Sequence, residues 1–202
     1  MIGVVIIVSK FALKLARNSM RPIVVVDSMV SSHDVSVLID TGANVPVWVC
    51  SVEDLLFYYP DARYVMKTDL HGFGGNGKIV PVYKIPIFKF GDFTFLNFIV
   101  LVDEDESADF DLIVCAPMFW GTNYGCDTIV RKKKNSNELV DFTFNVVYKH
   151  EDIVRHMEFK DGKLYVRCIK SSVSKKGINN SLETYSNLLN AFLDFFRRKG
   201  SI

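Results

Sequence analysis

The sequence predicts a mainly β protein, and three observations support this fold class. β-branched and aromatic residues gather in short runs, turn-forming residues separate these runs, and helical spacing is largely confined to residues 51–59 and 180–196. The chain has 202 residues, of which 49% are hydrophobic, so one globular domain with a short extension can bury a substantial core. Its net charge of +1 indicates neither a nucleic-acid nor an anionic membrane partner.

The first segment, residues 1–18, is expected to be an N-terminal strand or extension. Residues 2–8 form an apolar run that is too short to span a bilayer. Its basic residues follow the apolar run, whereas a signal peptide places them before it. We therefore expect a strand in a cytoplasmic protein without an integral membrane segment, and a weak membrane anchor is the alternative.

Residues 19–170 are expected to form the main domain. Residues 23–26 and 35–39 predict two strands with turn residues between them. Ser51 is expected to cap a short helix, with Asp54 three positions later, and Pro60 is expected to end it.

Strands are also predicted over residues 78–102, with a hairpin turn at Gly91 and Asp92. Residues 102–109 form an acidic loop whose spacing matches no calcium-binding loop, so we expect a solvated turn. Residues 110–119 are continuously apolar and predict a strand that is buried on both faces.

The remaining pattern includes a charged loop at residues 131–137 and strands at 140–148 and 153–169, the latter folded at an Asp-Gly turn. Residues 171–202 predict a linker and a C-terminal amphipathic helix that begins near Asn180. Its apolar face is expected to consist of Leu182, Tyr185, Leu188, Leu189, Phe192, Leu193 and Phe196.

The glycine-rich stretch "LHGFGGNGKIVPVYKIP" (70–86) can be aligned with two phosphate-binding signatures. Both signatures need a helix directly after the glycines, because the helix N-terminus holds the phosphates. Here Pro81 and Pro86 break any helix, the residues between them alternate as in a strand, and Ile79 stands where a magnesium-binding Ser or Thr is required. The context therefore argues against a nucleotide.

Metal and cofactor sites have little support in the sequence. The four cysteines form no C-x-x-C pair, and the four histidines have no metal-site spacing. We expect no cofactor, no metal and four reduced, mostly buried thiols.

The stretch "VSVLIDTGANVPVWV" (35–49) carries the strongest chemical pattern. An apolar strand delivers the carboxylate of Asp40 at its end, Thr41 adds a hydroxyl, and Gly42 allows the backbone to approach the carboxylate closely. A carboxylate on an apolar strand is costly unless it is hydrogen-bonded or shares a proton with a second acid. Two such acids can activate a water and polarise a carbonyl, which is the chemistry of peptide hydrolysis.

The chain resembles the retropepsin-like aspartic proteases, and is closest to small bacterial members of that family. Three regions carry the resemblance in the family's order: "VLIDTGANVPVW", the glycine-rich "GFGGNG" followed by a strand, and the apolar "DLIVCAPMF". The resemblance covers about residues 20–130 and extends to the strands up to residue 170. It implies a closed β-barrel of the acid-protease type, with a short helix after the active-site loop. One departure is Cys115, which stands where the family usually has glycine.

The resemblance also implies roles for single residues. Asp40 would be the catalytic carboxylate, Thr41 would brace the pair of acids, and Gly42 would place its N–H near them. The implied substrate-binding residues, from the cleft and from a flap that closes over the peptide, are Ala43, Asn44, His71, Gly72, Phe73, Gly74 and Gly75.

Only one D-T-G occurs, because Cys126-Asp127-Thr128-Ile129 lacks the glycine. An active enzyme would therefore be a homodimer in which Asp40 of each subunit meets at the two-fold axis. The terminal segments 2–8 and 178–202 are candidates for dimer contacts. The alternative function is a catalytically inactive dimer of the same fold that binds peptides or acts as a scaffold.

Overall fold

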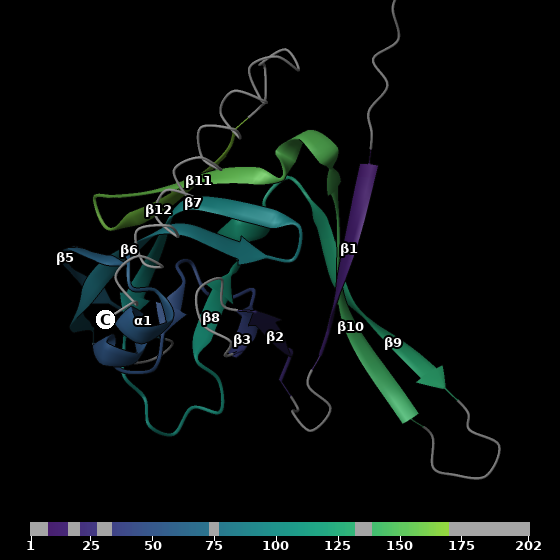
Figure 1. The fold of residues 1–202 in the computed structure, drawn as a ribbon, viewed down its shortest axis with the longest axis horizontal. Coiled ribbons are helices and arrows are strands. Elements are labelled where there is room, and N and C mark those ends of the chain that lie inside the picture. Colours follow the sequence, from purple (N-terminus) through teal and green to yellow (C-terminus); the bar gives the residue numbers. More distant parts are fainter. Residues whose placement is uncertain (1–7, 16–20, 28–33, 73–76, 132–138, 170–202) are drawn as a thin grey trace, which may run out of the picture. The chain divides into compact units, whose positions relative to one another are not determined.

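The computed structural model describes residues 8–15, 21–27, 34–72, 77–131 and 139–169 (Figure 1). The chain divides into two compact units, residues 1–169 and 170–202. The predictions for residues 2–7, for most of the charged loop at 131–137 and for the C-terminal helix lie outside the described residues.

Within the described residues, strands dominate and one α-helix is present, which confirms the mainly β fold class. In chain order the elements are β1 (Val8–Lys14), β2 (Ile23–Asp27), β3 (Asp34–Asp40), β4 (Val47–Trp48), α1 (Val52–Tyr58), β5 (Arg63–Leu70), β6 (Lys78–Phe90), β7 (Phe93–Val102), β8 (Leu112–Cys115), the 3₁₀ turn η1 (Ala116–Phe119), β9 (Asn123–Arg131), β10 (Leu139–Lys149), the 3₁₀ turn η2 (His150–Asp152), β11 (Val154–Lys160) and β12 (Lys163–Cys168).

The larger sheet has nine strands and positions the predicted active-site segment. Seven strands follow the order β12-β11-β7-β4-β8-β3-β2, while β6 pairs with β7 and β5 pairs with β6. The pairs β3–β8, β4–β7 and β11–β7 are parallel, and the others are antiparallel. The sheet curls, but in the described part of the chain its end strands β2 and β12 do not pair with each other, so a closed barrel is not shown (Figure 1).

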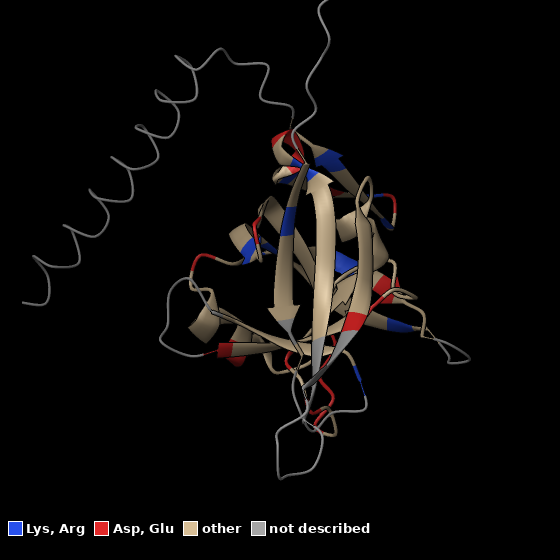
Figure 2. Cartoon of the chain, turned by 90° about the vertical axis from the view of Figure 1, so that its right-hand side faces the viewer, with Lys and Arg blue, Asp and Glu red and all other residues tan. Residues whose placement is uncertain are grey.

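A second, three-stranded antiparallel sheet has the order β1-β10-β9. Aromatic side chains join it to the larger sheet. Phe11 of β1 meets Phe93 of β7 with ring centroids 5.1 Å apart, and Phe144 of β10 meets Phe90 of β6 at 6.4 Å. In the view of Figure 2 this sheet faces the reader, and its strands are mostly neither acidic nor basic.

The local predictions hold where a specific side chain or turn residue decides the structure. Ser51 caps α1 by accepting a hydrogen bond from the Asp54 N–H at 3.0 Å, and the helix ends before Pro60, as predicted. The turns at residues 91–92 and 161–162 join their strands as predicted, with Gly91, Asp161 and Gly162 in the left-handed region.

One prediction needs correction, and two further strands had no prediction. The apolar run 110–119 is not one strand, because β8 ends at Cys115 and Pro117 fixes the backbone of η1. The strands β5 and β9 were not predicted, since "RYVMKTDL" and "NYGCDTIVR" lack a clear alternation of apolar and polar residues.

Among the described residues, no helix is long and apolar enough to cross a membrane.

Candidate functional site

Asp40 lies at the end of β3, where two parallel strands meet. Val35, Val37 and Ile39 alternate into the core and fix the strand, which leaves Asp40 half-buried at its last position. The neighbouring strand β8 ends at the same level, with Cys115 opposite Asp40. At the other end of the pair, the backbone N–H of Ser36 donates to Asp111 Oδ2 at 2.7 Å. The β3–β8 pair is thus held at both ends.

The loop that follows Asp40 passes across the end of β8. After residue 46 the chain enters β4, which pairs with β8 on the side opposite to β3. The Ala43 N–H donates to the Asp40 carbonyl at 3.2 Å, and the Ala116 N–H donates to the Ala43 carbonyl at 3.3 Å. The loop is therefore tied by main-chain hydrogen bonds to the end of β3 and to the first residue of η1, directly after β8.

Gly42 is the residue that contacts the carboxylate. Its N–H donates to Asp40 Oδ1 at 2.8 Å. A Cβ at this position would lie 3.2 Å from the same oxygen, which is tighter than ordinary van der Waals contact. Glycine thus allows the N–H and the carboxylate oxygen to meet without a competing side chain.

The remaining residues of the predicted catalytic and cleft set lie at the surface of this loop. Thr41, Gly42 and Asn44 are exposed, and Ala43 is half-buried against the core. A single chain therefore presents Asp40 on an open face rather than in an enclosed cavity.

Cys115 is fully buried beside Asp40. Burial raises the pKa of its thiol to about 12, and the nearby Asp40 carboxylate acts in the same direction. The side chain is therefore a neutral, apolar neighbour of the carboxylate. All four thiols are free, but only Cys115 is fully buried, and Cys126 is exposed.

The glycine-rich stretch connects two strands of a hairpin. β5 and β6 pair antiparallel up to Leu70 and Lys78, so His71 and Gly72 stand at the tip end of the hairpin. His71 and Gly72 are exposed there, while Phe73, Gly74 and Gly75 lie outside the described residues. Lys78 forms an ion pair with Asp103, which ties the tip's base to the end of β7. Because a strand follows the glycines, the helix that a nucleotide site needs is missing from this position.

Much of this hairpin stands clear of the core. Tyr64, Val65 and Met66 of β5 and Ile79 of β6 expose between 40% and 69% of their surface. Trp48, by contrast, is fully buried and donates its indole N–H to the Ser51 carbonyl at 3.1 Å, so it belongs to the core rather than to a substrate cleft.

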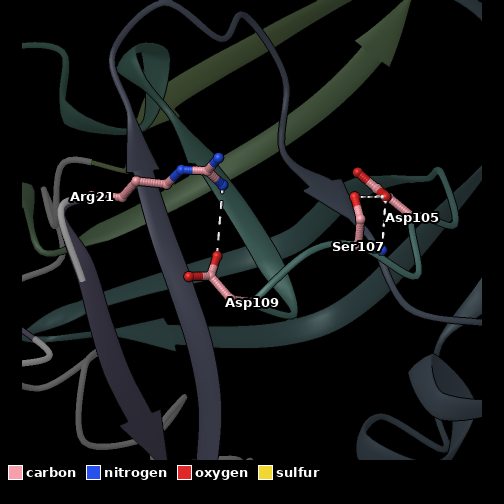
Figure 3. A network of polar contacts seen from close by, with 4 residues as sticks. All are labelled: Arg21, Asp105, Ser107 and Asp109. Carbon is pink, nitrogen blue, oxygen red and sulfur yellow. Dashed lines mark hydrogen bonds and ion pairs between the residues drawn. The ribbon is translucent and has the colours of Figure 1, made fainter. Parts of the chain in front are cut away.

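The carboxylates of Asp105 and Asp109 in the acidic loop interact with nearby side chains and with the backbone (Figure 3). Ser107 donates its hydroxyl and its N–H to Asp105 Oδ1 at 2.6 and 3.0 Å, and these bonds lower the pKa of Asp105. Arg21 lies 3.6 Å from Asp109. No group of three or more potential metal ligands occurs among the described residues.

Two surface hollows involve other parts of the chain. One, of about 480 Å³, is lined by Ser9, Lys10, Asp92, Tyr148, His150 and Ile153. The other, of about 380 Å³, lies between the start of α1 and the acidic loop. Neither is lined by Asp40.

Sequence reasoning missed one buried residue near this site, Arg155 of β11. It is 1% exposed and donates to the carbonyls of Met118 in η1, the turn that follows Cys115, and of Trp120 directly after it. The sequence did contain a sign of this, because Arg155 shares its strand face with Met157 and Phe159, which are apolar. An arginine within an apolar alternation is a candidate for burial.

The structure is similar to the crystal structure of a retropepsin-like aspartic protease from Rickettsia conorii. The two share 14% sequence identity with a TM-score of 0.40, over 73% of this chain and 97% of that chain. No family model and no curated protein matches the sequence. The similarity is a distant one and concerns the fold alone.

Proposed function

We propose that this protein is an aspartic endopeptidase that works as a homodimer, with one Asp40 from each subunit. The observation that carries the proposal is the geometry at the end of β3. A half-buried carboxylate meets the Gly42 N–H at 2.8 Å, on a loop tied to Ala116, directly after the adjacent strand β8. The open face around Asp40 leaves room for the same face of a second copy.

In the proposed dimer the two Asp40 carboxyl groups share one proton. The ionised group takes a proton from a bound water, whose oxygen attacks the scissile carbonyl carbon. The protonated group gives its proton to the carbonyl oxygen, so a tetrahedral diol forms. Its collapse breaks the C–N bond as the amide nitrogen accepts a proton. The Gly42 N–H holds the carboxylate in place, and Thr41 braces the pair across the two-fold axis.

The β5–β6 hairpin is the proposed lid over the peptide. Its tip carries His71 and Gly72, and the Lys78–Asp103 ion pair anchors its base. A lid that closes on the substrate excludes water and aligns the scissile bond. The exposed apolar side chains Tyr64, Met66 and Ile79 suit an extended peptide with apolar residues.

The proposal is tested with Asp40→Asn. The amide cannot share the proton or act as a base, so cleavage of an unstructured protein at mildly acidic pH is expected to fall to background. Sedimentation is expected to give a dimer for both proteins, because the substitution conserves shape. Asp127→Asn, at an exposed position of β9, is the matched control and should cleave normally. Full activity of the Asp40→Asn protein would refute the mechanism.

A second candidate is a peptide-binding dimer without catalysis. Cys115 favours it, because its buried side chain fills a place beside Asp40 that glycine leaves open in the family the sequence resembles. A pepstatin-type inhibitor separates the two functions. Saturable peptide binding without inhibitor-sensitive turnover supports the binding module, whereas inhibitor-sensitive cleavage supports the enzyme.

A further inference from the structure

Arg155 is a buried cation whose partners are main-chain carbonyls. Its side chain is 1% exposed in β11, and burial lowers its pKa. The guanidinium lies over the Phe93 ring, 4.2 Å from the centroid. Its Nη2 is buried without a hydrogen-bond partner among the described residues. A buried charge satisfied in this incomplete way is a poor source of stability compared with an apolar side chain.

Two of the three carbonyls that Arg155 binds lie at the end of one short turn, η1. Its Nη1 donates to the Met118 carbonyl at 2.8 Å and to the Trp120 carbonyl at 3.0 Å, and its Nε faces the Asp152 carbonyl at 3.3 Å. A planar guanidinium reaches the two carbonyls at the end of η1 at once, which an ammonium group does less well.

The same turn leads directly into the candidate site at its other end. η1 begins at Ala116, whose N–H donates to the Ala43 carbonyl, and the preceding residue, Cys115, lies opposite Asp40. A single 3₁₀ turn has weak internal hydrogen bonds, so its position depends on the packing of its buried side chains Pro117, Met118 and Phe119 and on what binds its ends. Arg155 holds the far end, and the Asp40 loop lies against the near end.

We propose that Arg155 is a positioning residue for Asp40, acting through η1 and the Ala116–Ala43 hydrogen bond. The inference rests on the proposed function for its effect on catalysis, but the structural link can be measured without any activity. Arg155 is not expected to contact substrate. It fixes the position of η1 relative to β8. Through the Ala116–Ala43 hydrogen bond it thereby also fixes the loop in which the Gly42 N–H donates to the Asp40 carboxylate.

The structural link is tested by amide hydrogen exchange in Arg155→Met. The Ala116 N–H is expected to exchange at least about tenfold faster than in the unsubstituted protein, because the turn loses its anchor. The Val146 amide in the three-stranded sheet is expected to keep its rate. Met157→Ala is the matched control, since Met157 is equally buried on the same face of β11 but cannot donate to η1. An unchanged Ala116 rate overturns the proposal.

The catalytic effect is tested by separating kcat from KM. Displacement of the Asp40 loop is expected to lower kcat about tenfold to a hundredfold in Arg155→Met, with little change in KM. Met157→Ala is expected to lower thermal stability without this loss of kcat. Arg155→Lys keeps the charge and one donor nitrogen. Compared with Arg155→Met, it should therefore recover part of kcat and part of the protection of the Ala116 amide. Equal losses of kcat in Arg155→Met and Met157→Ala would reduce Arg155 to a structural residue.

The amide-exchange and kinetic experiments together also distinguish failure of this inference from failure of the proposed function. If the unsubstituted protein shows no Asp40-dependent cleavage, the proposed function fails, and amide exchange alone decides whether Arg155 anchors the loop. If Arg155→Met does not fold, Arg155→Lys against the unsubstituted protein decides by the same two measurements. Full kcat and full Ala116 protection in Arg155→Lys would then overturn the proposal.

Discussion

At Gly42, the absence of a side chain determines how closely the backbone N–H can approach the Asp40 carboxylate. Its N–H reaches Asp40 Oδ1 at 2.8 Å, and a Cβ would lie 3.2 Å from that oxygen. The residue is exposed, so its identity contributes little to the core. Its value lies in the position of the carboxylate, which a substitution can change while the fold stays intact.

We therefore predict that Gly42→Ala lowers kcat about tenfold, because the methyl group displaces the carboxylate by a few tenths of an ångström. The free energy of unfolding, measured with urea, should change by less than about 1 kcal/mol. Gly125→Ala is the matched control, since a Cβ there meets no atom within 4 Å. Equal activity of the two variants would contradict the role given to Gly42.

The turn between β6 and β7 is one of the elements that join the two sheets. Gly91 has a left-handed φ of +56° and lies directly against the ring of Phe11 in β1. Beside it, the Tyr148 hydroxyl of β10 donates to Asp92 Oδ2 at 2.5 Å. The β1–β10–β9 sheet thus contacts the larger sheet through the tip of a hairpin as well as through aromatic rings.

We predict that Gly91→Ala lowers the free energy of unfolding more than Gly162→Ala does. Both glycines have left-handed φ, so each substitution costs about 1–2 kcal/mol in backbone strain. Only at Gly91 does the new methyl group also meet the Phe11 ring, which adds at least ~1 kcal/mol. Urea unfolding of the two variants measures the difference, and equal losses would show that Phe11 moves aside freely.

Among the described residues, several weakly acidic groups are held in their neutral form by full or partial burial. Burial raises the pKa of Cys50 and Cys115 from 9.0 to about 12, and the nearby Asp111 adds to the effect at Cys50. Burial, together with the hydrogen bond to Asp92, raises the pKa of Tyr148 from 10.0 to about 12. In the unfolded chain these groups lose their protons at lower pH than in the native one.

The free energy of unfolding is therefore predicted to fall as pH rises from about 9 to 12. In that window the unfolded state binds fewer protons than the native state, so each step up in pH favours unfolding. Urea titrations between pH 7 and 11 measure the slope. Cys115→Ala should give a shallower slope because it removes one of these groups, and an unchanged slope would show that Cys115 does not contribute.

The sequence predicts best those features that depend on one or two residues. The Ser51 cap, the turns at 91–92 and 161–162 and the strand ending at Asp40 follow from local chemistry. The β3–β8 pairing and the burial of Arg155 depend on residues far apart in the chain, which periodicity does not describe. The strand break at Cys115 was missed because an apolar run hides the effect of Pro117.

The parallel pairing of β3 and β8 also determines when the candidate site can form during folding. All of β4, α1, β5, β6 and β7 lies between these two strands in the chain, so their pairing closes a long loop. Hairpins such as β6–β7 join neighbouring segments and form early, whereas non-local pairings form late. Asp40 and Cys115 would thus come together near the end of folding, and a chain arrested before that step would contain the hairpins without the site.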